Sequence, residues 1–201
     1  PTCDRYWREP LLEFSPDGAD IGPLVFTKWE LSPDGKVWTL KIREGLRYSD
    51  GSLMTADDYV FFWNEVYGNE TLSPTFPSTL KAGGKPGVIA KVDDYTFTLS
   101  FAAPYPLLAV LFAQPRFFVA PRAYAEKFHA KYADKATLDK MVADAKFERW
   151  DQLFGAKVFS TNAILDNPEL PTWNVYTTIT PMTDPNYTAT RNAYYFKVDP
   201  E

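Results

Sequence analysis

The chain has 201 residues, of which 45% are hydrophobic and 16% aromatic, which is enough for one substantial core or for one domain and part of a neighbour. Its net charge is −5, from 21 basic and 26 acidic residues, and the interspersed charges leave no basic stripe for binding nucleic acid. No apolar run reaches the length of a membrane span. The single cysteine, Cys3, excludes an internal disulfide and a cysteine metal cluster.

Turn-forming residues are frequent in the first 22 residues. Pro10, the run Ser15-Pro16-Asp17-Gly18 and Gly22 interrupt any regular element there, because proline and Asp-Gly pairs favour turns. We therefore predict a loop-rich N-terminal segment over residues 1–22. We interpret Cys3 as an ordinary thiol and not as a lipoprotein anchor, because no apolar export segment precedes it.

A strand and a capped helix follow. Residues 37–42 (VWTLKI) are mostly β-branched or aromatic and predict a strand, which the turn Pro33-Asp34-Gly35 precedes. A further turn, Ser49-Asp50-Gly51, separates this strand from Thr55. Thr55 with Asp58 three residues later approximates a capping box, so the sequence predicts a helix that begins here. The predicted helix carries the apolar residues Val60, Phe61, Phe62, Trp63 and Val66.

The middle of the chain predicts a loop, a hairpin and a short helix. Residues 69–87 contain several prolines and glycines and read as a long loop. Residues 88–92 and 95–101 predict two strands of a hairpin, because the second alternates apolar and polar side chains with period two. Residues 107–113 predict a buried helix with Pro106 at or near its first position.

The C-terminal half predicts helices and then a proline-broken region. Residues 123–132 and 137–154 have helical periodicity, and in this interpretation His129 is a surface residue of the first helix. The second helix has an apolar stripe of Leu138, Met141, Val142 and Ala145. Prolines interrupt the chain beyond Gly155, and residues 173–180 predict a strand.

The stretch from Trp29 to Trp63 resembles the signature of the family 5 extracytoplasmic solute-binding proteins. That signature runs W-x-x-S-x-D-G-x-x-x-T-F-x-L-R-x-G-V-x-F-S-D-G-x-P-x-T-A-x-D-V-x-F-S-W, and the chain follows its spacing without a gap. The matching residues are Trp29, Ser32, Asp34, Gly35, Thr39, Arg43, Gly45, Ser49, Asp50, Gly51, Thr55, Ala56, Asp58, Phe61 and Trp63. Leu53 departs from the signature proline. Residues 191–199 also resemble the family's R-N-P-x-Y-W-x-x-D segment, with Ala193 and Phe196 as departures.

The resemblance implies a fold and a division of the chain. Such receptors have two lobes that close on a ligand in a periplasmic-binding-protein-like type II fold. We therefore expect the α+β class, with a mixed, mainly antiparallel sheet and flanking helices. The expected division is the N-terminal segment 1–22, an accessory α+β domain over 23–160 and part of the first binding lobe over 161–201. Because family members are far longer, we expect the chain to be a fragment that lacks the second lobe.

Catalytic and metal chemistry find little support in the sequence. His129 is the single histidine, which leaves no credible Ser-His or Cys-His pair and too few ligands for zinc. The carboxylate pairs Asp57/Asp58 and Asp93/Asp94 are adjacent in sequence and suit helix capping and a turn, not the two sides of a glycosidase cleft. We expect a protein without enzymatic activity, cofactor or metal.

The resemblance implies the substrate-binding component of an ABC importer. Its ligand would be an oligopeptide or an oligosaccharide, bound in the periplasm or outside the cell and delivered to a membrane permease. We expect a monomer that does not bind nucleic acid and that is held at the membrane, if at all, through parts outside this chain. Candidate ligand contacts are Trp173, Asn174 and Tyr176, whose alternative roles are packing and turn formation. The alternative function is an aromatic-rich carbohydrate-active enzyme or carbohydrate-binding module.

Overall fold

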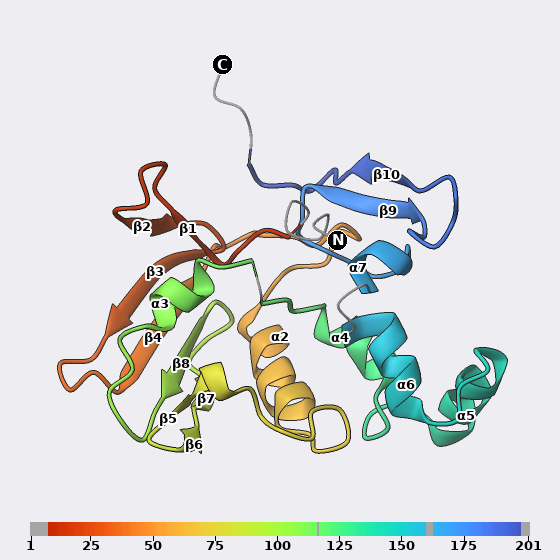
Figure 1. The fold of residues 1–201 in the computed structure, drawn as a ribbon, viewed down its shortest axis with the longest axis horizontal. Helices are drawn as coiled ribbons and strands as arrows, with labels where there is room; N and C mark the ends of the chain where they lie inside the picture. Colours follow the sequence, from red (N-terminus) through yellow and green to blue (C-terminus); the bar gives the residue numbers. More distant parts are fainter. Residues whose placement is uncertain (1–7, 116, 160–162, 198–201) are drawn as a thin grey trace. The chain divides into compact units, whose positions relative to one another are not determined.

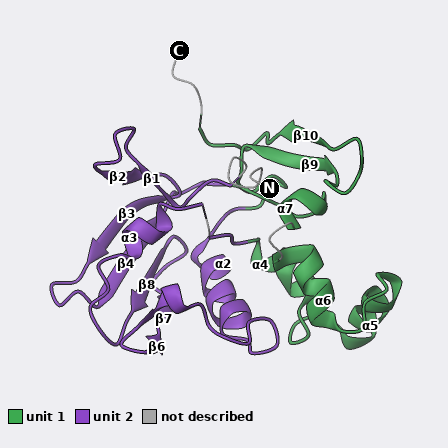
Figure 2. Ribbon diagram, viewed as in Figure 1, with its two compact units in different colours: residues 1–7, 47–52, 120–201 green, residues 8–46, 53–119 purple. Residues whose placement is uncertain are grey.

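The computed structural model describes residues 8–115, 117–159 and 163–197 (Figure 1). Cys3 and the last two residues of the 191–199 segment lie outside these ranges, and so do the predictions made for them. The chain forms two compact units (Figure 2). Unit 1 comprises Pro1–Trp7, Arg47–Ser52 and Ala120–Glu201, and unit 2 comprises Arg8–Leu46 and Leu53–Val119. The division into 1–22, 23–160 and 161–201 stays a prediction.

Unit 2 is built on a four-stranded antiparallel sheet in the order β3-β4-β8-β7 (Figure 1). Its strands are β3 (Phe26–Leu31), β4 (Val37–Ile42), β7 (Val88–Lys91) and β8 (Thr96–Ser100). The predicted strand 37–42 and the predicted hairpin are confirmed. Alternation places Trp38, Leu40, Ile42, Phe97 and Leu99 on the buried face of the sheet.

The helix α2 (Ala56–Phe61) packs on the sheet and continues as the π-helix η1 (Phe62–Tyr67). It begins as predicted: Thr55 is the N-cap, and the Asp58 carboxylate accepts a hydrogen bond from the Thr55 N–H at 2.9 Å. The Tyr59 ring stacks on Phe97, with 5.0 Å between the centroids. This contact joins the helix to the buried face of the sheet.

Shorter elements complete unit 2. Two antiparallel hairpins are formed by β1 (Leu12–Phe14) with β2 (Ile21–Pro23) and by β5 (Lys81–Ala82) with β6 (Lys85–Pro86). The second hairpin and the 3₁₀-helix η2 (Ser78–Leu80) lie within the predicted loop 69–87. The predicted helix 107–113 is the shorter α3 (Leu108–Phe112), and Pro106 precedes its N-cap, Leu107.

The helices of unit 1 differ from the predicted helices 123–132 and 137–154, the first of which already ends at Phe128. They are α4 (Arg122–Ala125), η3 (Glu126–Phe128), α5 (Lys135–Asp144), α6 (Trp150–Phe154), η4 (Gly155–Phe159) and α7 (Ala163–Asp166). The prediction of a single helix over 137–154 is wrong, because the chain turns at Lys146, where φ is +59°. The N–H groups of Lys146 and Phe147 donate to the carbonyls of Ala143 and Val142 at 2.9 and 3.0 Å, as in a Schellman motif.

The surface position expected for His129 is also wrong. Its side chain is 1% exposed, since the helical backbone ends at Phe128 and His129 adopts an extended conformation (φ −100°, ψ 124°). The imidazole then packs against the rings of Trp150 and Phe154 of α6.

The last elements of unit 1 form a two-stranded antiparallel ribbon, β9 (Tyr176–Thr180) with β10 (Thr188–Arg191). The strand predicted over 173–180 therefore begins at Tyr176. All strand pairs among the described residues are antiparallel, which confirms the predicted mainly antiparallel α+β class. Within the same residues, every helix is too short or too polar to span a membrane.

The approach of Gly87 to Phe101 predicts a stability effect. A Cβ added at Gly87 would lie 2.6 Å from Cε1 of the buried Phe101 ring, so we expect Gly87→Ala to lower the free energy of unfolding by about 1–3 kcal/mol. Gly155→Ala is the control, because no atom lies within 4 Å of its added Cβ and the substitution favours the helix. Urea denaturation of both variants checks this, and an equal effect of the two substitutions would contradict it.

Candidate functional site

The three predicted ligand contacts lie in one segment of unit 1, where the chain enters β9. The side chains of Trp173 and Asn174 are each 1% exposed, whereas Tyr176, the first residue of β9, is 44% exposed. The structure therefore brings Trp173 and Asn174 together in the interior of the unit and leaves the Tyr176 side chain at the surface. Ligand contact by these residues stays a prediction.

Asn192 holds this segment in place through its side-chain amide. Its Nδ2 donates to the carbonyls of Thr172 and Asn174 at 3.1 and 3.0 Å, and its Oδ1 accepts the N–H of Tyr194 at 2.9 Å. Asn192 is 3% exposed, so these bonds form away from water. Sequence reasoning missed this role, although the R-N pair at 191–192 is part of the motif that resembles the receptor family.

The turn Ser49-Asp50-Gly51 packs on the same segment. Ser49 and Thr172 exchange two hydrogen bonds: the Ser49 N–H donates to the Thr172 carbonyl at 2.8 Å, and the Thr172 N–H donates to Ser49 Oγ at 3.1 Å. The Tyr48 ring meets Trp173 edge-on at 6.2 Å. Part of the signature stretch thus supports the predicted contact segment, although the predicted division assigned all of it to the accessory domain.

A polar depression of about 230 Å³ opens beside these contacts within unit 1. Its lining combines hydroxyl groups, two carboxylates and two prolines, and consists of Ser49, Asp50, Pro168, Glu169, Leu170, Pro171, Thr177 and Thr178. This volume is below the usual range of small-molecule sites, about 300–1,000 Å³, and suits one residue or one sugar ring of a longer ligand. No sequence pattern predicted this grouping, because its members come from segments that lie over a hundred positions apart.

Hydrogen bonds fix several of the lining groups. Asp50 Oδ1 accepts bonds from the Ser52 N–H at 2.9 Å and the Ser52 hydroxyl at 2.6 Å, and Glu169 pairs with Lys157 at 3.0 Å. Thr178 Oγ1 donates to the Ile164 carbonyl at 2.8 Å. The depression thus presents carboxylate and hydroxyl oxygens to a ligand, which suits ligands that carry hydroxyl, amide or ammonium donors.

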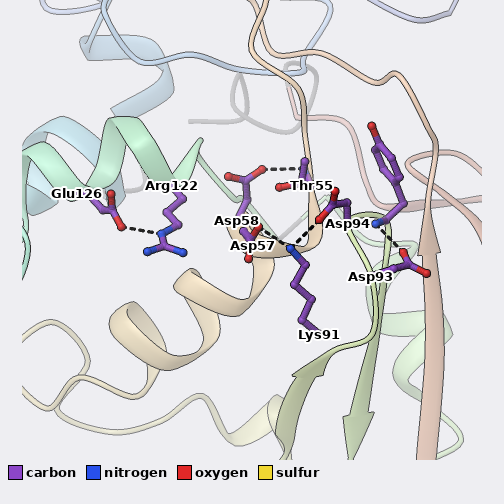
Figure 3. Close-up of polar contacts among 9 residues, drawn as sticks. Thr55, Asp57, Asp58, Lys91, Asp93, Asp94, Arg122 and Glu126 are labelled. Atoms are coloured by element: carbon purple, nitrogen blue, oxygen red, sulfur yellow. Dashed lines mark hydrogen bonds and ion pairs between the residues drawn. The ribbon is translucent and has the colours of Figure 1, made fainter.

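The adjacent carboxylate pairs Asp57/Asp58 and Asp93/Asp94 have structural roles in unit 2 (Figure 3). Lys91 Nζ bridges Asp57 and Asp94 at 2.7 and 2.8 Å, which joins the first turn of α2 to the β7–β8 hairpin, and hydrogen bonds to both carboxylates raise the pKa of Lys91. Asp93 Oδ1 accepts the Tyr95 N–H at 2.8 Å, and this bond lowers the pKa of Asp93. The carboxylates therefore stabilise the fold, as the sequence indicated for capping and turn formation.

Among the described residues, neither a metal-binding cluster nor the apolar hollow of unit 2 provides another candidate site. No group of three or more His, Cys, Asp or Glu side chains in these residues could hold a metal ion. Unit 2 contains a partly open apolar hollow of about 20 Å³, bordered by Tyr59, Trp63 and Phe97 among others. That volume is close to the room a single water molecule needs, so it is a packing void and not a ligand site.

Two relatives illustrate the similarity to known proteins. The periplasmic oligopeptide-binding protein OppA of Salmonella typhimurium is 33% identical over 130 residues, which cover 58% of this chain and 24% of OppA. The periplasmic alpha-galactoside-binding protein of Rhizobium meliloti is 25% identical over 193 residues, or 94% of this chain and 25% of that protein. The chain thus spans about a quarter of the length of these relatives.

Solved structures agree with the sequence relatives. An oligopeptide-binding protein OppA superposes with a TM-score of 0.88 and 30% identity, covering 98% of this chain and 30% of that one. The periplasmic binding protein MelB of Agrobacterium fabrum C58, in complex with stachyose, gives a TM-score of 0.69 and 26% identity, covering 96% of this chain and 27% of that one.

The family assignment rests on a match over more than half of the chain. Residues 20–148 match the description "Bacterial extracellular solute-binding proteins, family 5 Middle". This range contains the stretch Trp29–Trp63, where the sequence resemblance is densest. The chain belongs to family 5 of the bacterial extracellular solute-binding proteins.

Proposed function

We propose that the chain is part of the substrate-binding component of an ABC importer that captures oligopeptides outside the cytoplasm. The observation that carries this proposal is the superposition on an oligopeptide-binding protein OppA over 98% of the chain, with a TM-score of 0.88 and 30% identity. In this proposal the ligand enters between two lobes, of which unit 1 supplies part of one, and closure buries it. The closed receptor then delivers the ligand to a membrane permease.

Oligosaccharides are the second ligand class, and two observations favour them. The alpha-galactoside-binding relative aligns with 94% of the chain, a longer match than that of the OppA relative. The depression in unit 1 is lined by carboxylate and hydroxyl oxygens, which form hydrogen bonds with sugar hydroxyls as readily as with peptide groups. The proposal places both ligand classes at the same site.

The remaining parts of the proposal concern location, partners and chemistry. The named relatives are periplasmic, so we place this protein in the periplasm or outside the cell, held at the membrane, if at all, by segments beyond these residues. It acts as a monomer, does not bind nucleic acid, and binds its ligand without catalysing a reaction. The family consists of binding proteins, which supports the last point.

The three predicted contact residues take different roles in this proposal. Tyr176 has the exposed ring and contacts the ligand directly, next to Thr177 and Thr178 of the depression. Trp173 and Asn174 are buried and support the segment from the interior. The site is therefore a surface built on a rigid interior, as binding sites generally require.

Calorimetry on the complete receptor that carries this chain tests the ligand class. We expect heat of binding and a raised melting temperature with trialanine, with stachyose or with both, since a ligand at 100 times its Kd adds about 2.7 kcal/mol to stability. Binding of trialanine alone selects the peptide class, and binding of stachyose alone selects the oligosaccharide class. Absence of binding by broader sets of peptides and oligosaccharides would contradict the proposal.

Tyr176→Ala should weaken ligand binding. The lost ring contact predicts a roughly fivefold higher Kd, because an aromatic contact contributes on the order of 1 kcal/mol. Phe14→Ala is the matched control, since Phe14 is also 44% exposed but belongs to unit 2. Titration calorimetry with the ligand that the complete receptor binds measures both variants. An equal Kd for Tyr176→Ala and wild type would remove Tyr176 from the site.

A further inference from the structure

Tyr194, which follows shortly after β10 in unit 1, is an exposed aromatic residue beside the proposed site. The residue is 46% exposed, yet its ring rests on the chain at Gly51. A Cβ added at Gly51 would lie 3.1 Å from the Tyr194 Oη and 3.2 Å from its Cζ. Gly51 directly follows Asp50, so the ring lies against the turn that contributes Ser49 and Asp50 to the lining of the depression.

The backbone of Tyr194 is fixed to the interior of unit 1. Its N–H donates to Asn192 Oδ1 at 2.9 Å. Asn192 is 3% exposed, and its Nδ2 donates to the carbonyls of Thr172 and Asn174. The same buried amide therefore holds the segment that enters β9 and the residue that carries the exposed ring.

The turn under the ring is closed by its own hydrogen bonds. The Gly51 N–H donates to the Tyr48 carbonyl at 2.9 Å, and the Tyr48 N–H donates to the Ser52 carbonyl at 2.9 Å. Gly51 has a φ of +84°, which glycine adopts without strain, and its missing side chain leaves the space that the ring occupies. An exposed ring supported in this way loses little conformational freedom when a ligand binds.

We propose that Tyr194 is a further ligand contact, whose exposed ring face packs on a ring of the ligand beside the depression. This inference rests on the proposed binding surface of unit 1 and names the group that is bound there, a ring with a C–H face. Such a ring belongs to a sugar unit of an oligosaccharide or to an aromatic side chain of a peptide. The carboxylate and hydroxyl oxygens of the depression then accept hydrogen bonds from the polar groups next to that ring.

Titration calorimetry on the complete receptor tests this contact with stachyose, the tripeptide Ala-Phe-Ala and trialanine, because only the first two carry a ring. Tyr194→Ala should raise the Kd of a ring-bearing ligand roughly fivefold and leave the Kd of trialanine unchanged. Tyr194→Phe, which keeps the ring, should bind like the wild type. A rise with stachyose assigns the ring to a sugar, and a rise with Ala-Phe-Ala assigns it to a peptide side chain.

Three results would overturn the inference. They are an equal rise in the Kd of trialanine, no rise with either ring-bearing ligand, and a loss in Tyr194→Phe as large as in Tyr194→Ala. A receptor that binds trialanine but neither ring-bearing ligand would also overturn it.

Gly51→Ala provides an independent measurement, because its added Cβ would displace the Tyr194 ring. It should raise the Kd of the ring-bearing ligand in the wild-type background and have a smaller effect in the Tyr194→Ala background. Gly45→Ala is the matched control: its φ is +79°, but no atom lies within 4 Å of the added Cβ, so its Kd should equal that of the wild type. An equal effect of Gly51→Ala in both backgrounds would overturn the inference, and if Gly51→Ala does not fold, the Tyr194 variants decide.

Failure of this inference differs from failure of the proposed function. A wild-type receptor that binds neither peptides nor oligosaccharides would contradict the proposed function itself. A wild-type receptor whose binding is weakened by Tyr176→Ala but unchanged by Tyr194→Ala would keep the proposed function and remove Tyr194 from the site.

Discussion

Replacing Trp173 with alanine is expected to lower the free energy of unfolding of unit 1 by about 3–5 kcal/mol. The side chain is 1% exposed and packs edge-on against Tyr48, so its removal leaves a cavity as well as lost apolar burial. Urea denaturation followed by circular dichroism measures the change. The result would place Trp173 among the packing residues that support the proposed site.

Tyr176→Ala is the control for this prediction, because Tyr176 lies three residues away in the same segment but is 44% exposed. Its substitution should change the free energy of unfolding by no more than about 0.5 kcal/mol. If Trp173→Ala instead left stability unchanged and removed ligand binding, the indole would be a ligand contact and not a supporting residue.

The second large effect is expected at Asn192. Replacing it with leucine removes two donors to buried carbonyls and the acceptor of the Tyr194 N–H, so we expect a loss of about 2–4 kcal/mol. The Thr172 carbonyl would still accept the hydrogen bond from the Ser49 N–H in this variant. The loss of stability should therefore be smaller than if that carbonyl were left without any partner. Urea denaturation of Asn192→Leu measures it.

A charge variant at the same position separates hydrogen bonding from packing. In Asn192→Asp the introduced carboxylate would face the carbonyl oxygens of Thr172 and Asn174, so its pKa in the folded state should rise above the ordinary value near 3.9. Relative to wild type, this variant should therefore be least stable at neutral pH and recover as the pH falls towards about 4. Asn186→Asp, at an exposed position before β10, is the control and should show no such recovery. Equal pH profiles for the two aspartate variants would contradict the buried amide role.

Local sequence signals predicted those elements whose causes are local. The strand Val37–Ile42 and the β7–β8 hairpin follow from alternation of apolar and polar residues. The start of α2 follows from Thr55 and Asp58, because the capping contact spans only three residues. These elements would be recognisable in any chain with the same short patterns.

Two features of unit 1 could not be predicted from the sequence, one because its residue type gives no local signal and one because it depends on distant contacts. A lysine at φ +59° ends α5, and lysine gives no local signal for a left-handed turn, which glycine usually occupies. The burial of His129 depends on Trp150 and Phe154, more than twenty residues further along the chain. Helical periodicity alone therefore joined two helices that the structure separates and placed a buried histidine at the surface.

Only part of the candidate site was predictable, because its residues come from segments that are distant in the sequence. The aromatic and amide residues at 173, 174 and 176 led to the prediction of ligand contacts in this stretch. Which of these side chains are buried was not predictable, because the segment is held by contacts with Tyr48 and Asn192. The polar depression combines Ser49 and Asp50 with residues 168–178, a pairing that only the folded chain reveals. The family signature contains Ser49 and Asp50, whereas no family motif marked residues 168–178.

Hydrogen–deuterium exchange of the complete receptor, with and without the peptide or oligosaccharide that calorimetry identifies, tests the central proposal most directly. Ligand binding is predicted to slow exchange in residues 168–178 and 47–52, where the depression and its supporting turn lie, and to leave the β1–β2 hairpin of unit 2 unchanged. Saturating ligand that leaves both stretches unprotected would show that the receptor binds elsewhere, and would contradict the proposed site.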